Sequence, residues 1–173
     1  MRKVVLFIAD SLDGFIARKN DQIDWLFTDG DYGYKAFYES IDTVLMGRKT
    51  FQKIIEMGGE YHYSDKINYI FTHNEDIALK DDYMHVVSKN ISHFINEIKR
   101  SPGMNIWLVG GGEVVKYFLN ENLLDEIILS IHPKILGDGI PLFPSPLRET
   151  DLILKDVLKF ESGLVQLHYE VLR

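Results

Sequence analysis

The stretch NIWLVGGGEVVKYF, residues 105–118, joins a buried-strand pattern, a triple glycine and the start of a helix without interruption. The apolar run 106–109 has the length of a strand and shows no polar alternation, which is typical of a strand covered on both faces of its sheet. Apolar residues then recur at helical spacing from Val114 to Leu119. The stretch therefore predicts a central strand that leads directly into a helix.

The three glycines lie where the chain leaves this predicted strand. Gly110, Gly111 and Gly112 remove every Cβ there, so the backbone can adopt unusual φ/ψ angles and a ligand can approach it closely. The first N–H groups of the following helix would point at that ligand, which favours an anion. The alternative is a tight turn without a ligand. We favour the ligand site because three successive glycines cost conformational entropy that a plain turn does not require.

A second junction of the same kind occurs earlier in the chain. Residues 43–46, TVLM, form a short buried-strand pattern, and Gly47-Arg48-Lys49-Thr50 leads from it into a helical pattern. At this junction the glycine is followed by two cationic residues, Arg48 and Lys49. The sequence thus places two strand–glycine–helix units in one chain, and ligands of open α/β sheets bind at such strand ends.

The remaining patterns indicate the fold class. Further strands are predicted at 3–9, 67–72 and 83–87, and helical patterns alternate with them, which indicates an α/β sandwich with a mostly parallel sheet. The two last apolar segments, 152–160 and 164–172, predict an antiparallel hairpin at one edge of the sheet. No repeat, linker or low-complexity segment interrupts the chain, so residues 1–173 are expected to form one domain.

Composition restricts the classes of function. The chain has 173 residues, a net charge of −7 and no basic run, which argues against a nucleic acid partner. It has no cysteine, which excludes disulfides, thiolate nucleophiles and cysteine-ligated zinc. Its histidines show no metal-ligand spacing, so no metal is expected. The longest apolar runs have the length of strands and the first strand begins at the amino terminus, so we expect no membrane span, no signal peptide and a cytoplasmic location.

Two segments between the first strand and the Gly47 junction carry candidate site residues. Asp13-Gly14 marks a sharp turn into an irregular stretch that extends to about Gly30, and such loops are often lids. Within it, Trp25 either fills the core or covers a ligand. Residues 31–40 then predict an amphipathic helix with Asp31 at or near its start, where Asp31 could simply be the N-cap. A later helix is expected to be capped by Asn90.

Several of these motifs together resemble a known superfamily. SLDGFIA at 11–17, MGRKTF at 46–51 and VGGGEV at 109–114 resemble dihydrofolate reductases, and GDGIPLF at 137–143 is similar to the reductase domain of the bifunctional riboflavin deaminase-reductase. The resemblance runs from the first strand to the last, in the family's order. It implies a dihydrofolate reductase-like three-layer α/β/α sandwich, a mixed and mostly parallel sheet, a homodimer and an NADPH-dependent reductase. Because the zinc deaminase signature requires cysteines, only the reductase half is expected here.

The resemblance also assigns residues to the cofactor. Residues 47–50 would hold the pyrophosphate and the adenosine phosphate, and residues 110–114 the pyrophosphate and the nicotinamide side. In the family the Gly-Gly peptide at 110–111 is often cis. Arg48 alternatively is a solvated cation at a helix start. The residues that the resemblance places at NADPH are Ala9, Ile16, Gly47, Arg48, Lys49, Thr50, Thr72 and His73 near the 2′-phosphate, Lys89 near the adenine, Val109, Gly110, Gly111, Gly112, Glu113 and Val114.

The substrate half is expected around Ser11, Trp25 and Asp31. A buried Asp31 carboxylate could bind the N–C–N face of a pterin or aminopyrimidine and supply or orient the proton that accompanies hydride transfer. Asp13 is the second candidate for catalysis, although Asp-Gly is ordinary turn chemistry. The resemblance implies a small pyrimidine-type, pterin-type or sugar-linked aminopyrimidine substrate, as for 5-amino-6-(5-phosphoribosylamino)uracil reductase. A dihydrofolate reductase proper and a non-catalytic NADP-binding module remain alternatives.

Overall fold

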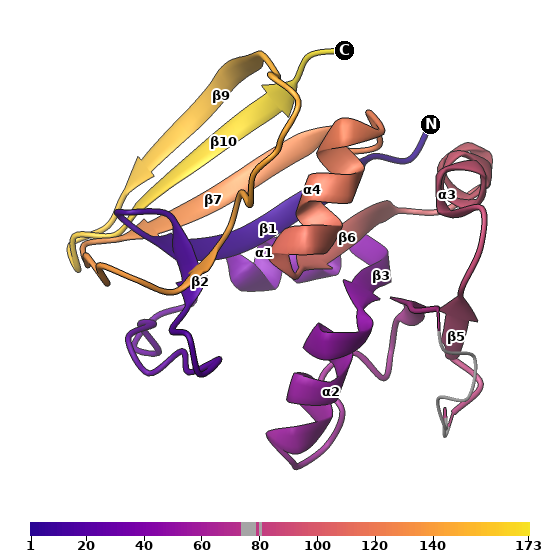
Figure 1. Ribbon diagram of the computed structural model, residues 1–173, viewed down its shortest axis with the longest axis horizontal. Coiled ribbons are helices and arrows are strands. Elements are labelled where there is room, and N and C mark those ends of the chain that lie inside the picture. Colours follow the sequence, from indigo (N-terminus) through magenta and orange to yellow (C-terminus); the bar gives the residue numbers. More distant parts are fainter. Residues whose placement is uncertain (74–78, 80) are drawn as a thin grey trace.

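A computed structural model describes residues 1–73, 79 and 81–173 of the chain. Its main feature is an eight-stranded sheet with the order β5-β4-β3-β6-β1-β7-β10-β9 (Figure 1). The strands are β1 (Val4–Ser11), β3 (Ile41–Gly47), β4 (Ile67–Phe71), β5 (Met84–Val87), β6 (Asn105–Gly110), β7 (Glu126–His132), β9 (Leu152–Lys159) and β10 (Val165–Val171). The helices are α1 (Tyr34–Glu39), α2 (Arg48–Glu56), α3 (Ile91–Arg100) and α4 (Gly112–Asn120).

The pairing of the strands confirms the predicted mixed sheet. β1 lies between β6 and β7 and is parallel to both, so the first strand is next to the glycine strand. β10 is antiparallel to β7 and to β9, which confirms the carboxyl-terminal hairpin. β10 pairs with the parallel part of the sheet and β9 forms its outer edge (Figure 1).

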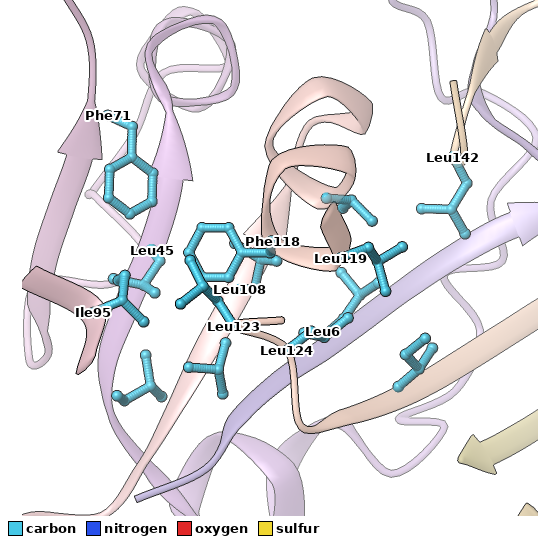
Figure 2. Packing of buried hydrophobic residues seen from close by; sticks show 14 of the residues in the cluster. Leu6, Leu45, Phe71, Ile95, Leu108, Phe118, Leu119, Leu123, Leu124 and Leu142 are labelled. Carbon is cyan, nitrogen blue, oxygen red and sulfur yellow. The ribbon is translucent and has the colours of Figure 1, made fainter. Parts of the chain in front are cut away.

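Helices cover both faces of the sheet, which gives the three expected layers. One face carries Phe37 of α1 and Phe51 of α2 in a cluster with Trp107 of β6. On the other face Phe118 of α4 packs over the sheet near Leu108 (Figure 2). Trp107 and Leu108 are neighbours on β6 and contribute to opposite cores, as expected for a strand whose side chains alternate between two buried faces. This explains why β6 shows no polar alternation.

The structure corrects three local predictions. α1 begins at Tyr34, three residues after Asp31, because Tyr32 and Gly33 have φ angles of 48° and 80° and cannot belong to a helix. Asn90 precedes α3 with a φ of 51° and makes no side-chain capping hydrogen bond. The only cis peptide among the described residues is Ser145–Pro146, so the expectation of a cis Gly110–Gly111 bond is wrong.

The stretch predicted as irregular contains a short strand. β2 (Phe15–Ala17) pairs antiparallel with β8 (Ile140–Pro141) of the segment that follows β7. The two strands make a small second sheet next to the end of β1 (Figure 1). Leu142 N–H also donates to the Gly14 carbonyl over 2.9 Å. The Ser11–Ala17 segment is therefore fixed by a distant part of the chain, which its local sequence does not reveal.

Candidate active site

The two glycine junctions lie next to each other at the carboxyl ends of β3 and β6. These strands are parallel neighbours, with Met46 opposite Gly110 in the register. The Thr50 hydroxyl, in the first turn of α2, donates to the Gly110 carbonyl over 3.3 Å and links the two junctions. The amino-terminal ends of α2 and α4 therefore face the same edge of the sheet, which is where anions bind in this class of fold.

The triple glycine leaves no room for side chains. Gly111 has a φ of +89°, and a Cβ there would lie 3.1 Å from Thr50 Oγ1. A Cβ on Gly112 would lie 2.5 Å from the Pro141 carbonyl oxygen. A Cβ on Gly110, whose φ is +124°, would lie 3.0 Å from the Ile8 side chain. The glycines therefore allow these neighbours to pack closely against the backbone at the start of α4, whose first N–H groups have no partner within the helix.

The other predicted cofactor residues also lie at this edge of the sheet. Arg48 and Lys49 begin α2 and are exposed. Thr72 and His73 follow β4, and Lys89 follows β5. Because β3, β4, β5 and β6 are all parallel, the residues that follow each strand gather at one edge. Residues 74–78, which continue from His73, lie outside the described residues.

β1 and β6 are paired along only part of their length. Their pairing ends at Leu6 and Leu108, whereas β1 continues to Ser11 along its other neighbour, β7. Beyond Leu6 the β6 side of β1 therefore has no partner strand among the described residues. Just past the last pair, Trp107 Nε1 donates to the Phe7 carbonyl over 3.1 Å. Ala9 lies on this unpaired part of β1, and Ile16, on β2, is half-buried.

A pocket of about 410 Å3 lies beside this part of β1, on the α1 face of the sheet. Its walls are largely aromatic, and its floor carries polar groups of β7. The lining residues are Phe7, Ala9, Leu26, Phe27, Gly30, Asp31, Tyr32, Tyr34, Ser130, His132 and Leu164. Apolar walls with a few convergent polar groups are typical of small-molecule sites, and this pocket has the size of such sites. A larger hollow near Met1 and Arg100 lies at the amino ends of the strands, away from both glycine junctions.

Asp31 lies at the rim of this pocket. Its side chain is exposed, so the expectation of a buried carboxylate is wrong. The physical reason is the late start of α1, because the left-handed Gly33 keeps residue 31 outside the helix. Asp31 Oδ1 accepts a hydrogen bond from the Lys35 N–H over 2.9 Å. The carboxylate thus satisfies a first-turn donor of α1, as a cap does.

His132 holds the aromatic loop against the pocket. It is 4% exposed, and its Nε2 accepts the Phe27 N–H over 3.1 Å while its Nδ1 lies 3.3 Å from the Ser130 carbonyl. The rings of Trp25 and Phe27 pack on it at centroid distances of 5.3 and 4.9 Å. Burial lowers the pKa of His132, so the neutral ring that accepts from Phe27 is the favoured form. Trp25 is buried, and its ring fills space in the core beside the pocket.

Ser11 and Asp13 organise the turn after β1. The buried Ser11 hydroxyl donates to Asp13 Oδ1 over 2.6 Å and accepts the Phe15 N–H over 3.0 Å. The exposed Asp13 carboxylate accepts from the N–H groups of Leu136 and Gly137 over 3.1 and 2.7 Å. The hydrogen bond from Ser11 is the main cause that lowers the pKa of Asp13. Every oxygen of Asp13 is engaged in fixing the turn, and it lies outside the pocket lining.

Three polar residues of the pocket region, Ser130, His132 and Gln166, were not identified from the sequence. The buried Gln166 amide of β10 donates to the Ser130 hydroxyl and to the Tyr32 carbonyl, each over 3.0 Å. It thereby fixes the left-handed Tyr32 next to Asp31. The signal in the sequence was that each of the three is a polar side chain within an apolar strand segment. The sequence could not show that these residues share one face, because that depends on the β7–β10 register.

Asp10 is a fourth residue that the sequence patterns did not identify. It is 5% exposed, and its Oδ1 has no hydrogen-bond partner among the described residues. Burial, and secondarily the charge of Asp13, raises the pKa of Asp10 to about 7. An ionised carboxylate without partners is costly to bury, so the protonated form persists near neutral pH. Perturbed acids of this kind concentrate at functional sites.

Within the described ranges, the chain has neither a membrane-spanning helix nor a cluster of metal ligands. No helix there is long and apolar enough to span a membrane. No group of three or more His, Asp or Glu side chains there is arranged to hold a metal ion.

Comparisons with known proteins place this chain in a family. The RibD C-terminal domain family matches residues 2–166. The uncharacterized protein YwjB of Bacillus subtilis (strain 168) is 41% identical to the chain, and the match covers 97% of this chain and 97% of YwjB. The uncharacterized protein YyaP of the same organism is 35% identical, and the match covers 97% of this chain and 94% of YyaP.

Solved structures of similar proteins show the same fold. A protein described as a riboflavin biosynthesis protein from Shewanella sp. PV-4 superposes with a TM-score of 0.86 at 27% identity, covering 99% of both chains. A diaminohydroxyphosphoribosylaminopyrimidine deaminase/5-amino-6-(5-phosphoribosylamino)uracil reductase from Thermotoga maritima has a TM-score of 0.73 at 17% identity, covering 99% of this chain and 57% of its own. The second likeness concerns the fold alone.

Proposed function

The chain belongs to the RibD C-terminal domain family, and on that premise we propose that it is an NADPH-dependent reductase that transfers hydride to a pyrimidine-type, pterin-type or sugar-linked aminopyrimidine substrate. The observation that carries the proposal is that the two glycine junctions, joined by Thr50, and an aromatic pocket lie at the same edge of the sheet, the one formed by the carboxyl ends of its parallel strands. One half of the edge suits a dinucleotide and the other half suits a flat ring.

The residues of the first half fit a nicotinamide dinucleotide. A Cβ on any of the three glycines would meet a neighbour at 3.1 Å or less, namely the Ile8 side chain, the Thr50 side chain or the Pro141 carbonyl, so only glycine fits at these positions. The amino-terminal N–H groups of α2 and α4 would hold the diphosphate, and the Arg48 guanidinium suits the 2′-phosphate that distinguishes NADPH from NADH. When bound, the cofactor supplies the hydride.

The residues of the second half would bind and orient the substrate. Phe7, Phe27 and Tyr34 offer ring faces and edges to a flat heterocycle. The Asp31 carboxylate would attract a protonated ring nitrogen or an N–C–N edge and orient the accompanying proton. His132, buried and neutral, would keep the loop of Trp25 and Phe27 closed over the pocket and so exclude water.

The proposal is tested by measuring NADPH binding by fluorescence and NADPH oxidation with a substrate panel. The panel contains sugar-linked aminopyrimidines with and without phosphate, free aminopyrimidines, pterins and dihydrofolate. We expect tight NADPH binding and turnover of at least one heterocycle. NADPH binding without turnover of any of them would indicate a cofactor-binding module instead. Absence of binding to NADPH would contradict the proposal altogether.

We further propose that the protein is a homodimer that pairs through β9. This edge strand is exposed at all eight positions, and five of them are apolar: Leu152, Ile153, Leu154, Val157 and Leu158, at 41–52% exposure. A long apolar edge strand is an aggregation hazard unless a partner covers it, and a second copy offers the same free edge in return. Light scattering should give twice the chain mass. Leu154→Lys should yield a monomer, and Ile135→Lys, at another exposed apolar residue, should not.

A further inference from the structure

The floor of the pocket holds a side chain whose hydrogen-bonding capacity is only partly used. Ser130 lines the pocket from β7 and is 5% exposed. Its register partner on β1 is Ala9, which also lines the pocket, and its register partner on β10 is Gln166. The three residues form one row across neighbouring strands and share a face of the sheet (Figure 1). Ser130 is therefore presented to the pocket between a methyl group and an amide.

The Gln166 amide determines what the Ser130 hydroxyl can do. Gln166 Nε2 donates to the Tyr32 carbonyl over 3.0 Å, and the orientation of the amide is settled because a carbonyl can only accept. The same nitrogen donates to the Ser130 hydroxyl over 3.0 Å. A hydroxyl has one O–H donor and two acceptor lone pairs, so Ser130 still has its O–H to donate. Within the described residues, the hydroxyl makes no hydrogen bond besides the one from Gln166.

The polar groups that adjoin Ser130, at His132 and Tyr32, are already engaged. His132 Nε2 accepts the Phe27 N–H and its Nδ1 faces the Ser130 carbonyl, so both ring nitrogens are used. The Tyr32 hydroxyl donates to a carboxylate of the same loop over 2.7 Å. Buried donors in folded proteins are nearly always paired. The free O–H at the floor of a pocket therefore points to an acceptor on a ligand.

The surroundings of Ser130 restrict the kind of acceptor. A phosphate or carboxylate at the floor would be a buried anion without a paired cation, which is costly. Among the described lining residues the one charged side chain is the Asp31 carboxylate, which repels an anion. The rings of Phe7 and Phe27 suit a flat heterocycle. An uncharged acceptor in the plane of such a ring is a ring carbonyl.

We propose that Ser130 donates its O–H to a ring carbonyl oxygen of the substrate, and that Gln166 positions the hydroxyl. This rests on the proposed reductase function and adds a specificity residue to its substrate half. It also orients the substrate, because the carbonyl edge lies on the floor and substituents such as a sugar extend toward the rim at Asp31.

The test compares two ligands that differ in a single group. Pterin has a ring carbonyl at the position where 2,4-diaminopteridine has an amino group, which offers donors in place of the acceptor. Dissociation constants of both are measured by fluorescence at neutral pH without added cofactor, for the unmodified protein, Ser130→Ala, Ser130→Cys and Gln166→Met. Ser40→Ala, at the other end of α1 and outside this pocket, is the matched control. NADPH affinity and circular dichroism are recorded for every protein.

The quantity compared is the affinity for pterin divided by the affinity for 2,4-diaminopteridine. Ser130→Ala should lower this ratio about five- to tenfold relative to the unmodified protein, because one hydrogen bond to the carbonyl is lost. Ser130→Cys should lower it by a smaller factor, since a thiol of similar size is a weak donor. Gln166→Met should also lower it less than Ser130→Ala, because the hydroxyl remains but is no longer fixed. Ser40→Ala should leave the ratio unchanged, and NADPH affinity should stay constant throughout.

Other results would overturn the inference. An unchanged ratio in Ser130→Ala, or in Ser130→Cys if the alanine variant does not fold, would remove Ser130 from substrate recognition. An equal loss of affinity for both pteridines would show that the substitution acts through the shape of the pocket and not through the carbonyl. If the unmodified protein bound NADPH but neither pteridine, the inference would fail while the proposed function stood. Pteridine binding with the expected ratios but without NADPH binding would contradict the proposed function and leave Ser130 as the donor.

Discussion

The two halves of the candidate site are built in different ways. The proposed cofactor half consists of two short continuous segments, at Gly47 and at Gly110, where the glycines let neighbouring side chains and one carbonyl pack directly against the backbone. The substrate half is assembled from side chains of β1, the loop before α1, β7 and β10. Gln166 and Tyr32, which touch there, are 134 positions apart in the chain.

This difference teaches which parts of such a site can vary. A backbone cradle tolerates almost any side chains around it provided that the glycines stay, so it suits a ligand common to many enzymes. A pocket of dispersed side chains can change its chemistry one residue at a time. The halves should therefore respond separately to substitution, and this independence is what the following experiments test.

The largest effect is expected from Asp31→Asn, in the substrate half. Once a substrate is identified, turnover should fall about 10²–10⁴-fold, because asparagine cannot carry charge or orient a proton. NADPH affinity should stay within a few-fold, and so should stability, since the amide oxygen can still accept the Lys35 N–H. Asp29→Asn, in the same loop, is the control. Normal turnover of Asp31→Asn would leave the residue with its capping role alone.

Gly111→Ala should act on the cofactor half. The alanine must adopt a φ of +89° and its Cβ would lie 3.1 Å from Thr50 Oγ1. Cofactor affinity measured by fluorescence should fall on the order of 10²-fold, with a loss of stability of about 1–3 kcal/mol. Gly59→Ala is a matched control, because Gly59 has a φ of +85° with no atom within 4 Å of the added Cβ. Equal affinities of the two variants would mean that the triple glycine is only a turn.

Arg48→Ala should discriminate between two cofactors. NADPH binding should weaken by about 1.5–3 kcal/mol, whereas NADH binding should change little, because only NADPH offers a 2′-phosphate for a charge-assisted hydrogen bond. Lys53→Ala, further along α2 and paired with Asp21 and Glu56, serves as control. Titration of NADPH and of NADH into both variants measures the four affinities that this prediction compares. Parallel losses for NADPH and NADH would assign Arg48 to the diphosphate or to general electrostatics.

The smallest effect is expected on the pH dependence of the free energy of unfolding in the unliganded protein. The pKa of Asp10 is about 7 in the folded protein and near 3.8 when unfolded, so the folded state binds more protons between these values. Stability is unaffected by this group below pH 3.8 and falls as the pH rises toward 7. Relative to Asp10→Asn, the unmodified protein should therefore lose about 1–2 kcal/mol between pH 5.5 and pH 8. Denaturant titrations of both proteins at the two pH values measure this, and parallel curves would contradict the burial of a neutral acid.

The sequence by itself determined the fold class and the positions of the two glycine junctions. Strands, glycine junctions and helices follow from the periodicity of consecutive residues, so the parallel sheet, the carboxyl-terminal hairpin and the meeting of Gly47 with Gly110 at one edge could all be predicted. A parallel sheet brings the ends of its strands together whatever their side chains are. That is why the family motifs could be recognised without coordinates.

Only the tertiary structure decided the substrate half and the state of Asp10. The exposure of Asp31 depends on the left-handed Gly33, and the pocket floor depends on the register that sets Ser130 beside Gln166. Asp10 looks like an ordinary polar residue at a strand end, and its burial requires the rest of the fold to close over β1. The burial of a side chain and its hydrogen bonds depend on residues that are distant in the sequence, so local sequence patterns do not reveal them.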